Sequence, residues 1–93
     1  MFEWSDLRHF LAVARSGSTL SAAKILGVNQ TTVARRVAAL EEAIGEKLFD
    51  KTAGGYRLTE VGSAMVQNAE RVEAEAEAFA RMVAQRSRKL LGM

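Results

Sequence analysis

The chain contains no cysteine and no proline, and it has one histidine. The lack of cysteine excludes disulfide bonds and thiolate metal ligands. Long apolar runs are also missing, since the longest covers Phe10 to Ala14, far below the roughly 18 residues that a membrane span needs. The first residues lack the cationic and apolar segments of a secretion signal. We therefore expect a cytoplasmic protein that has no membrane partner.

Candidate catalytic residues are equally scarce. His9 has no second histidine or cysteine with which to hold a transition metal. No glycine-rich phosphate loop precedes a helix. Ser16, Ser18 and Ser21 fit helix caps and turns better than a nucleophile, and the glutamates from Glu70 to Glu77 fit a solvated helix face. We therefore expect neither an enzyme nor a cofactor or metal site.

The composition is that of an ordered protein with two unlike regions. Thirteen Lys and Arg against eleven Asp and Glu leave a net charge of +2, which permits a nucleic-acid partner without proving one. Residues 1–59 carry eight basic and six acidic side chains and most of the glycines. No glycine lies between Ser63 and Leu91, and that stretch is rich in helix formers. We expect one domain over residues 1–59 and a linker helix over residues 60–93.

Periodic apolar residues predict three short helices in the first region. Ser5, Ser18–Thr19 and Asn29 are the expected N-caps, and the helices are expected to end at Gly17, Gly27 and Gly45. The residues expected to face inward are Leu7, Phe10, Leu11 and Ala14, then Leu20, Ala23 and Leu26, then Val33, Val37, Leu40 and Ile44.

A change of period then predicts a hairpin. Lys47–Phe49 and Tyr56–Leu58 are expected to form strands around Gly54–Gly55, with a positive φ at both glycines. Tyr56 is expected to pack rather than stack on a partner. Thr59 is the expected cap of the long helix. The fold class is therefore mainly α: three helices, a two-stranded hairpin and a long helix.

The connection between the second and third helices is short. Only Val28 and Asn29 separate Gly27 from the third helix, as in a helix-turn-helix. An ordinary helical corner is an equally good explanation of the spacing alone. The outer face of the third helix, however, carries Thr31 and Arg35 and no acid in its first two turns. A polar face at the positive end of a helix suits the major groove of DNA.

A set of spaced positions runs through nearly the whole chain, over about residues 4–92. Its members are Gly17–Ser18, Ala22–Ala23, Leu26–Val28, Gln30, Val33, Arg35, Val37, Leu40–Glu41, Gly45, Leu48–Phe49, Arg57–Glu60 and Gly62. Together they resemble the N-terminal region of LysR-type transcriptional regulators, which are bacterial proteins. The resemblance implies a winged helix-turn-helix that binds double-stranded DNA as a homodimer and regulates transcription.

The resemblance also implies which residues contact DNA. The third helix, about residues 30–44, would enter the major groove, and the wing, about residues 47–58, would lie near the minor groove or the backbone. The implied contacts are Gln30, Thr31, Thr32, Ala34, Arg35, Arg36, Lys51 and Arg57. Thr31 stands where relatives usually carry proline, and Ala34 stands where they usually carry serine. The base preference of this chain is therefore expected to differ near both positions.

The long helix carries an apolar seam that needs a partner. Its positions alternate by three and four residues, interrupted at Arg86, and run Met65, Ala69, Val72, Ala76, Phe79, Val83 and Leu90. Such a seam is typical of a coiled coil, and the resemblance likewise implies a dimerising linker helix. A helix folded back on its own domain is the alternative. A larger effector-binding domain is expected in such regulators, so a small-molecule effector would act only through a region absent from these residues.

Two other functions remain open from the sequence. The chain could be a helical protein-interaction module, in which case replacing Arg35 would not alter DNA binding. It could also be a winged-helix regulator of another family, with a different wing and dimer geometry but still with DNA as its partner.

Overall fold

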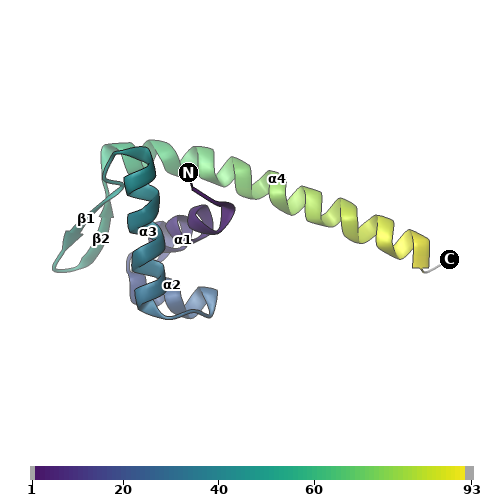
Figure 1. Ribbon diagram of the computed structural model, residues 1–93, viewed down its shortest axis with the longest axis horizontal. Coiled ribbons are helices and arrows are strands. Elements are labelled where there is room, and N and C mark those ends of the chain that lie inside the picture. The colour runs from purple at the N-terminus through teal and green to yellow at the C-terminus, as the bar shows by residue number, and fades with distance from the viewer. Residues whose placement is uncertain (1, 92–93) are drawn as a thin grey trace.

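The computed structural model describes residues 2–91, and the side chains of residues 2–88. Three helices are followed by a hairpin and a long fourth helix (Figure 1). The elements are α1 (Trp4–Ser16), α2 (Thr19–Leu26), α3 (Gln30–Ile44), β1 (Phe49–Thr52), β2 (Gly55–Leu58) and α4 (Glu60–Leu91). The predicted fold class, a mainly α winged helix-turn-helix with a long last helix, is confirmed.

The start of α1 differs from the expectation. Its N-cap is Glu3 rather than Ser5. The Glu3 N–H donates to Asp6 Oδ2 over 2.9 Å, and Asp6 is only 5% exposed. A carboxylate three residues into the helix thus accepts from the backbone N–H of the N-cap residue, as in a capping box. The other end agrees with the sequence, since Gly17 caps α1 with a φ of 84°.

The predicted buried face of α2 is wrong at a single position. Leu20 was expected to face inward, but it is 52% exposed. Ala23 and Leu26 face the core, as predicted, and Thr19 and Ala22 complete the buried face. Small side chains on that face let α2 lie close to both α1 and α3, which is how a helix of eight residues can belong to the core.

The core lies where the first three helices meet the base of the hairpin. Its largest fully buried side chains are Phe10, Leu11, Val13, Val33, Leu40 and Leu48. The rings of Phe10 and Phe49 are 5.5 Å apart, and those of Phe49 and Tyr56 are 5.6 Å apart. Tyr56 therefore packs against the core, as predicted, and connects the hairpin to α1.

The hairpin pairs Phe49 with Leu58 and Thr52 with Gly55. Its first strand begins at Phe49, two residues later than expected, because a side chain occupies the backbone groups that would have paired. Glu41 Oε2 accepts from the N–H of Leu48 over 2.8 Å and from that of Phe49 over 3.3 Å.

The far end of the hairpin is fixed to the turn that follows α1. The Tyr56 N–H donates to the Gly17 carbonyl oxygen over 2.9 Å. Gly55 has a φ of 128°, and a side chain there would collide with the same carbonyl. The predicted positive φ is therefore correct for Gly55 but wrong for Gly54, which lies in the turn outside the left-handed region.

Thr59 caps α4, as predicted. Its hydroxyl accepts from the Gly62 N–H over 3.0 Å and donates to the Lys47 carbonyl over 2.7 Å. Gly62 lies against the Leu48 carbonyl, where a Cβ would collide. The first turn of α4 is thereby held against the base of the hairpin.

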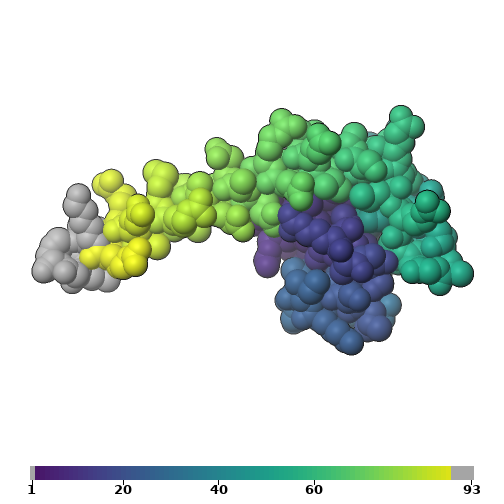
Figure 2. Space-filling model, turned by 180° about the vertical axis from the view of Figure 1, so that it is seen from behind, coloured from purple at the N-terminus to yellow at the C-terminus, as the bar shows by residue number. Residues whose placement is uncertain are grey.

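α4 packs on the body with its first three turns and then leaves it. Val61, Met65, Val66 and Ala69 lie against the core. The rest of the helix extends into solvent, so that the molecule measures 55 × 24 × 20 Å (Figures 1 and 2). The alternative of a helix folded back along its whole length is therefore excluded. Across the described residues, no helix combines the length and the apolar character that crossing a bilayer requires.

Candidate nucleic-acid interface

A helix-turn-helix is formed by α2, a two-residue turn and α3. Gly27 ends α2 in the left-handed conformation, with a φ of 70°. Asn29 caps α3, as predicted, since its Oδ1 accepts from the Thr32 N–H over 2.8 Å and from the Thr32 hydroxyl over 2.9 Å. The N-terminal end of α3 and the tip of the hairpin both lie away from α4 (Figure 1).

α3 buries one face and presents the other. Val33, Val37 and Leu40 are at most 3% exposed. Thr31 and Arg35, on the opposite side, are both exposed. Arg35 forms no ion pair with any side chain in the described part of the chain. The outward presentation predicted for Thr31 and Arg35 is therefore confirmed, while Ala34 beside them is partly covered.

Two other predicted contact residues have partners within the protein. Arg36 turns toward α1, where its Nη1 lies 3.3 Å from Asp6 Oδ1 and 3.9 Å from Glu3 Oε1. Its guanidinium therefore ties α3 to α1 rather than lying on the face of Arg35. The Thr32 hydroxyl is used in the cap with Asn29. Both residues thus have a structural role, and their predicted contact with DNA stays a prediction.

Gln30 is exposed at the start of α3, and it is also anchored. Its Nε2 donates to Thr19 Oγ1 over 2.9 Å, and Thr19 is only 4% exposed. This partner could not be predicted from the residues alone, because the link joins two helices that meet only in the folded chain.

The two cations of the hairpin point to opposite faces. Lys51 pairs with Tyr56, and Arg57 pairs with Asp50. Directly opposed residues share a face, and neighbours along a strand alternate. Lys51 Nζ lies 5.8 Å from the centre of the Tyr56 ring, whereas Arg57 has the Asp50 carboxylate as its cross-strand neighbour. The hairpin thus offers one cation on each face, and the positive charge of Arg57 is partly offset.

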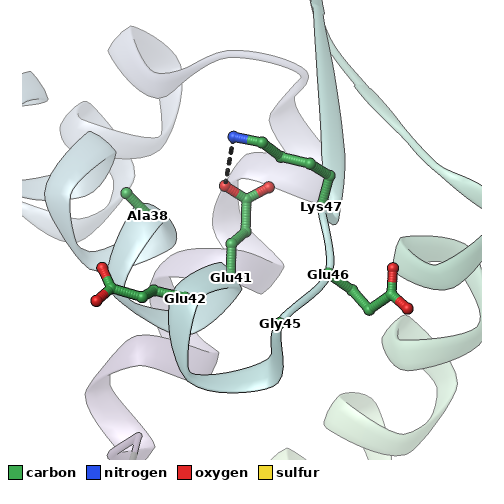
Figure 3. A pocket seen from close by; sticks show the side chains of 6 residues that line it. All are labelled: Ala38, Glu41, Glu42, Gly45, Glu46 and Lys47. Atoms are coloured by element: carbon green, nitrogen blue, oxygen red, sulfur yellow. Dashed lines mark ion pairs between the residues drawn. The ribbon is translucent and has the colours of Figure 1, made fainter.

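The C-terminal end of α3 is acidic. A depression there is lined by Ala38, Glu41, Glu42, Gly45, Glu46 and Lys47, and Glu41 Oε1 lies 3.8 Å from Lys47 Nζ (Figure 3). Glu42 and Glu46 point away from that ion pair. α3 is therefore polarised, with its uncharged and basic side chains near the N-terminal end and its carboxylates at the other. Phosphate would be attracted to the first end and repelled from the second.

The seam of α4 divides between the body and solvent. Ala69 is 4% exposed and Met65 is half-buried, both within the same protomer. Ala69 is thus largely covered by its own chain, and its predicted part in the dimer seam stays a prediction. Val72, Phe79 and Val83 are 46%, 67% and 50% exposed.

Two further seam positions and one missed residue complete this face. Ala76 is partly covered, and the side chain of Leu90 lies outside the described residues. Met82, which the three-and-four spacing had left out, is 60% exposed beside Phe79 and Val83. Met82 is apolar and lies three residues, about one helical turn, after Phe79, so it could have been included in the seam from the sequence alone.

An ion cluster stands where α4 leaves the body. Arg15 Nη2 and Nη1 lie 2.7 Å and 3.0 Å from the two carboxylate oxygens of Glu73, and Nη2 lies 3.2 Å from Glu70 Oε2. The hydrogen bonds that Arg15 donates lower the pKa of the Glu73 carboxyl, and the same bonds to Glu73 and Glu70 raise the pKa of Arg15. The ion pairs of Arg15 with Glu70 and Glu73 thus join α1 to α4 at the point where α4 leaves the body.

The described residues offer little for catalysis or metal binding. His9 is buried, with its Nδ1 2.6 Å from the Ser5 carbonyl oxygen. No group of three histidine, aspartate or glutamate side chains within residues 2–88 is arranged to hold a metal ion. The features that stand out are instead those of a DNA-binding domain of the winged helix-turn-helix class.

Comparison with known proteins defines the family. The model of the "Bacterial regulatory helix-turn-helix protein, lysR family" matches residues 4–63. The Mau operon transcriptional activator of Paracoccus denitrificans is 41% identical over 87 residues, which cover 94% of this chain and 31% of that protein. The regulator YofA of Bacillus subtilis is 43% identical over 70 residues, or 75% of this chain and 25% of that protein. The chain belongs to the LysR family of bacterial regulatory proteins.

Solved structures of relatives have the same architecture. The CbnR DBD–DNA complex superposes with a TM-score of 0.80 at 34% identity, over 90% of this chain and 98% of that one. The BenM DBD complex with catB site 1 DNA gives a TM-score of 0.87 at 26% identity, over 92% and 97%. The expectation of a DNA-binding regulatory domain, and not an enzyme, is thus confirmed. The chain spans 31% of the length of the Mau activator and 24–25% of several other curated relatives.

Proposed function

We propose that two copies of this chain bind a two-fold-related site on double-stranded DNA and thereby regulate transcription. The observation that carries the proposal is the exposed Thr31 and Arg35 face at the positive end of α3, on the side of the body away from α4. A helix presented in this way can enter the major groove with its N-terminal end first.

Within this proposal, Arg35 and Gln30 distinguish bases. An arginine can donate to both O6 and N7 of guanine, and a glutamine can pair with N6 and N7 of adenine. Thr31 adds a hydroxyl next to them. Ala34 offers no hydrogen-bonding group and can contact bases only through its methyl group. The acidic end of α3 around Glu42 and Glu46 favours the same orientation, because it is kept away from the phosphates.

The hairpin supplies contacts that do not depend on sequence. Lys51 and Arg57 stand on opposite faces of it, so an edge-on approach places one cation toward each phosphate backbone of a groove. Such contacts position the protein and give an affinity that falls with salt. Lys51 is the stronger candidate, because Asp50 lies beside Arg57.

Dimerisation through α4 is supported by apolar side chains that their own chain leaves exposed. Val72, Phe79, Met82 and Val83 lie along the helix outside the body. They continue into an apolar groove whose lining includes Phe2, Leu7, Ile44, Met65 and Val72. A second α4 would cover this surface. Two recognition helices related by a two-fold axis would then meet half-sites about one DNA turn, or a multiple of it, apart.

This function divides the chain into residues 1–59, which contact DNA, and residues 60–93, which link the two copies. We place the protein in the bacterial cytoplasm, where such DNA is found. A small-molecule effector would act through a region outside these residues, in keeping with the greater length of the relatives.

In-vitro selection from random duplexes tests the proposal. The wild-type chain should recover a motif with two-fold symmetry, and its half-site spacing would give the dimer geometry. An Arg35→Ala chain should recover a motif that is degenerate at one base pair in each half-site. Arg81→Ala removes the same charge from an exposed position on α4 and should recover the wild-type motif. Recovered sequences without a shared motif would contradict the proposal.

A further inference from the structure

Gln30 is held in place by a residue of the preceding helix. Its Nε2 donates to Thr19 Oγ1 over 2.9 Å. Thr19 is the first residue of α2 and is 4% exposed, whereas Gln30 is the first residue of α3 and is exposed. A buried hydroxyl therefore anchors the end of a long side chain that stands at the start of the proposed recognition helix.

The Thr19 hydroxyl is not needed to start its own helix. Ser18 makes the cap of α2, with its Oγ accepting from the Ser21 N–H over 3.0 Å. Among the described residues, the hydrogen bond with Gln30 is the one found for the Thr19 side chain. Local helix capping thus does not account for a buried hydroxyl at this position.

The anchor leaves a particular set of groups on Gln30. A carboxamide has two N–H donors and one carbonyl acceptor. The bond to Thr19 occupies one N–H, so the other N–H and Oε1 remain for a ligand. A bidentate contact with adenine uses groups of these two kinds, an N–H toward N7 and the oxygen toward the N6 amine.

The anchor also restricts the motion of Gln30 before any DNA is bound. A free glutamine side chain samples many rotamers, and fixing it on binding lowers the affinity. Because the bond to Thr19 has already restricted those rotamers, less conformational freedom remains to be lost. Because a hydroxyl can accept or donate, the bond holds the end of the side chain in place whichever way the amide faces.

We propose that Thr19 is a specificity-determining positioning residue, which holds the Gln30 side chain in place for its contact with adenine. This inference rests on the proposed function, since it concerns how Gln30 contacts a base. Thr19 itself does not touch DNA. Its removal should therefore weaken discrimination at one base pair and leave general DNA binding intact.

The experiment uses opposite substitutions at one position. Thr19→Val keeps the shape of the side chain and removes the hydroxyl, and Thr19→Ser keeps the hydroxyl and removes the methyl group. Both are compared with wild type and Gln30→Ala on the selected site and on duplexes that carry each single base-pair change. Thr19→Ala repeats the comparison without adding a methyl group, should Thr19→Val fail to fold.

Gln30→Ala should lose its preference at one base pair of each half-site. Thr19→Val should lower the same preference by roughly three- to tenfold and bind unrelated DNA as wild type does. Thr19→Ser should keep the preference. A Thr19→Val chain with full preference at that base pair, or one that loses affinity equally for every duplex, would overturn the role of Thr19. If the wild-type chain recovers no motif, or Gln30→Ala changes no base pair, the DNA contact of Gln30 fails and the inference fails with it.

Discussion

The body of the molecule and the outer part of α4 bury their apolar side chains in different ways. In the body, Phe10, Val33 and Leu40 are at most 1% exposed, so the protomer covers its own core. In α4 beyond Glu73, Phe79 and Met82 are 67% and 60% exposed. The body can therefore cover its own core within one copy, whereas in the proposed dimer the outer helix would gain its packing from a second copy. Stability and assembly are thus separable properties in one short chain.

Truncating the core should give the largest effect. Phe10→Ala should lower the free energy of unfolding by about 3–5 kcal/mol, because a fully buried ring in contact with Phe49 is lost and a cavity remains. Urea denaturation followed by circular dichroism measures this change. Phe79→Ala is the matched control and should leave the stability of the protomer almost unchanged. Equal losses for both variants would contradict the distinction between the two regions.

A charge in the seam should separate the two copies. Phe79→Glu places a carboxylate where the proposed interface would remove it from water. The affinity for the selected two-fold site should fall by about 100-fold, equivalent to about 2.7 kcal/mol. Sedimentation equilibrium should show a monomer whose circular dichroism still matches that of the folded body. An unchanged molecular mass would contradict the assignment of the seam.

Arg35→Ala should affect sequence recognition without affecting assembly. Removing one bidentate base contact should cost about 1–3 kcal/mol on the selected site and much less on unrelated DNA. Fluorescence anisotropy with both duplexes measures the difference. Arg81→Ala serves as the control for the loss of one positive charge. The same loss on both duplexes would show that Arg35 contacts only phosphate.

The ion cluster between the body and α4 should give the smallest effect. Arg15 lowers the pKa of Glu73 from its ordinary value of 4.5, so its contribution is complete above that value and is lost as the pH falls through the lowered pKa. Because both side chains are partly exposed, Glu73→Gln should cost less than about 1 kcal/mol. The difference in unfolding free energy from wild type should shrink between pH 6 and pH 3. A difference that grows on acidification would contradict the pairing.

The sequence predicted the order of the elements because each boundary has a local cause. Gly17, Gly27 and Gly45 end their helices in the left-handed conformation, and Asn29 and Thr59 cap the helices that follow. The outward face of α3 was also predictable, because four apolar positions at helical spacing marked the opposite face as buried.

What the sequence did not predict depends on contacts between elements. Leu20 matched the apolar period of α2, but close packing on α1 and α3 placed the smaller Ala22, with the predicted Ala23, on the buried face. From the sequence alone, Arg36 was expected to be a surface cation, but in the folded chain Asp6 of α1 lies 3.3 Å from it. Ala69 matched the seam, although its own body already covers it. A periodic pattern identifies a face of a helix, but it does not tell which neighbour covers that face.

The hydrogen bond from Tyr56 to the Gly17 carbonyl has a further consequence. It fastens the hairpin to the corner between α1 and α2, and α2 in turn leads directly into α3. The fold therefore holds the tip of the hairpin and the start of α3 at a fixed separation. In the proposed complex, a DNA site must have a groove width that lets α3 and the hairpin bind at the same time. The width of the groove would then be part of what this domain selects.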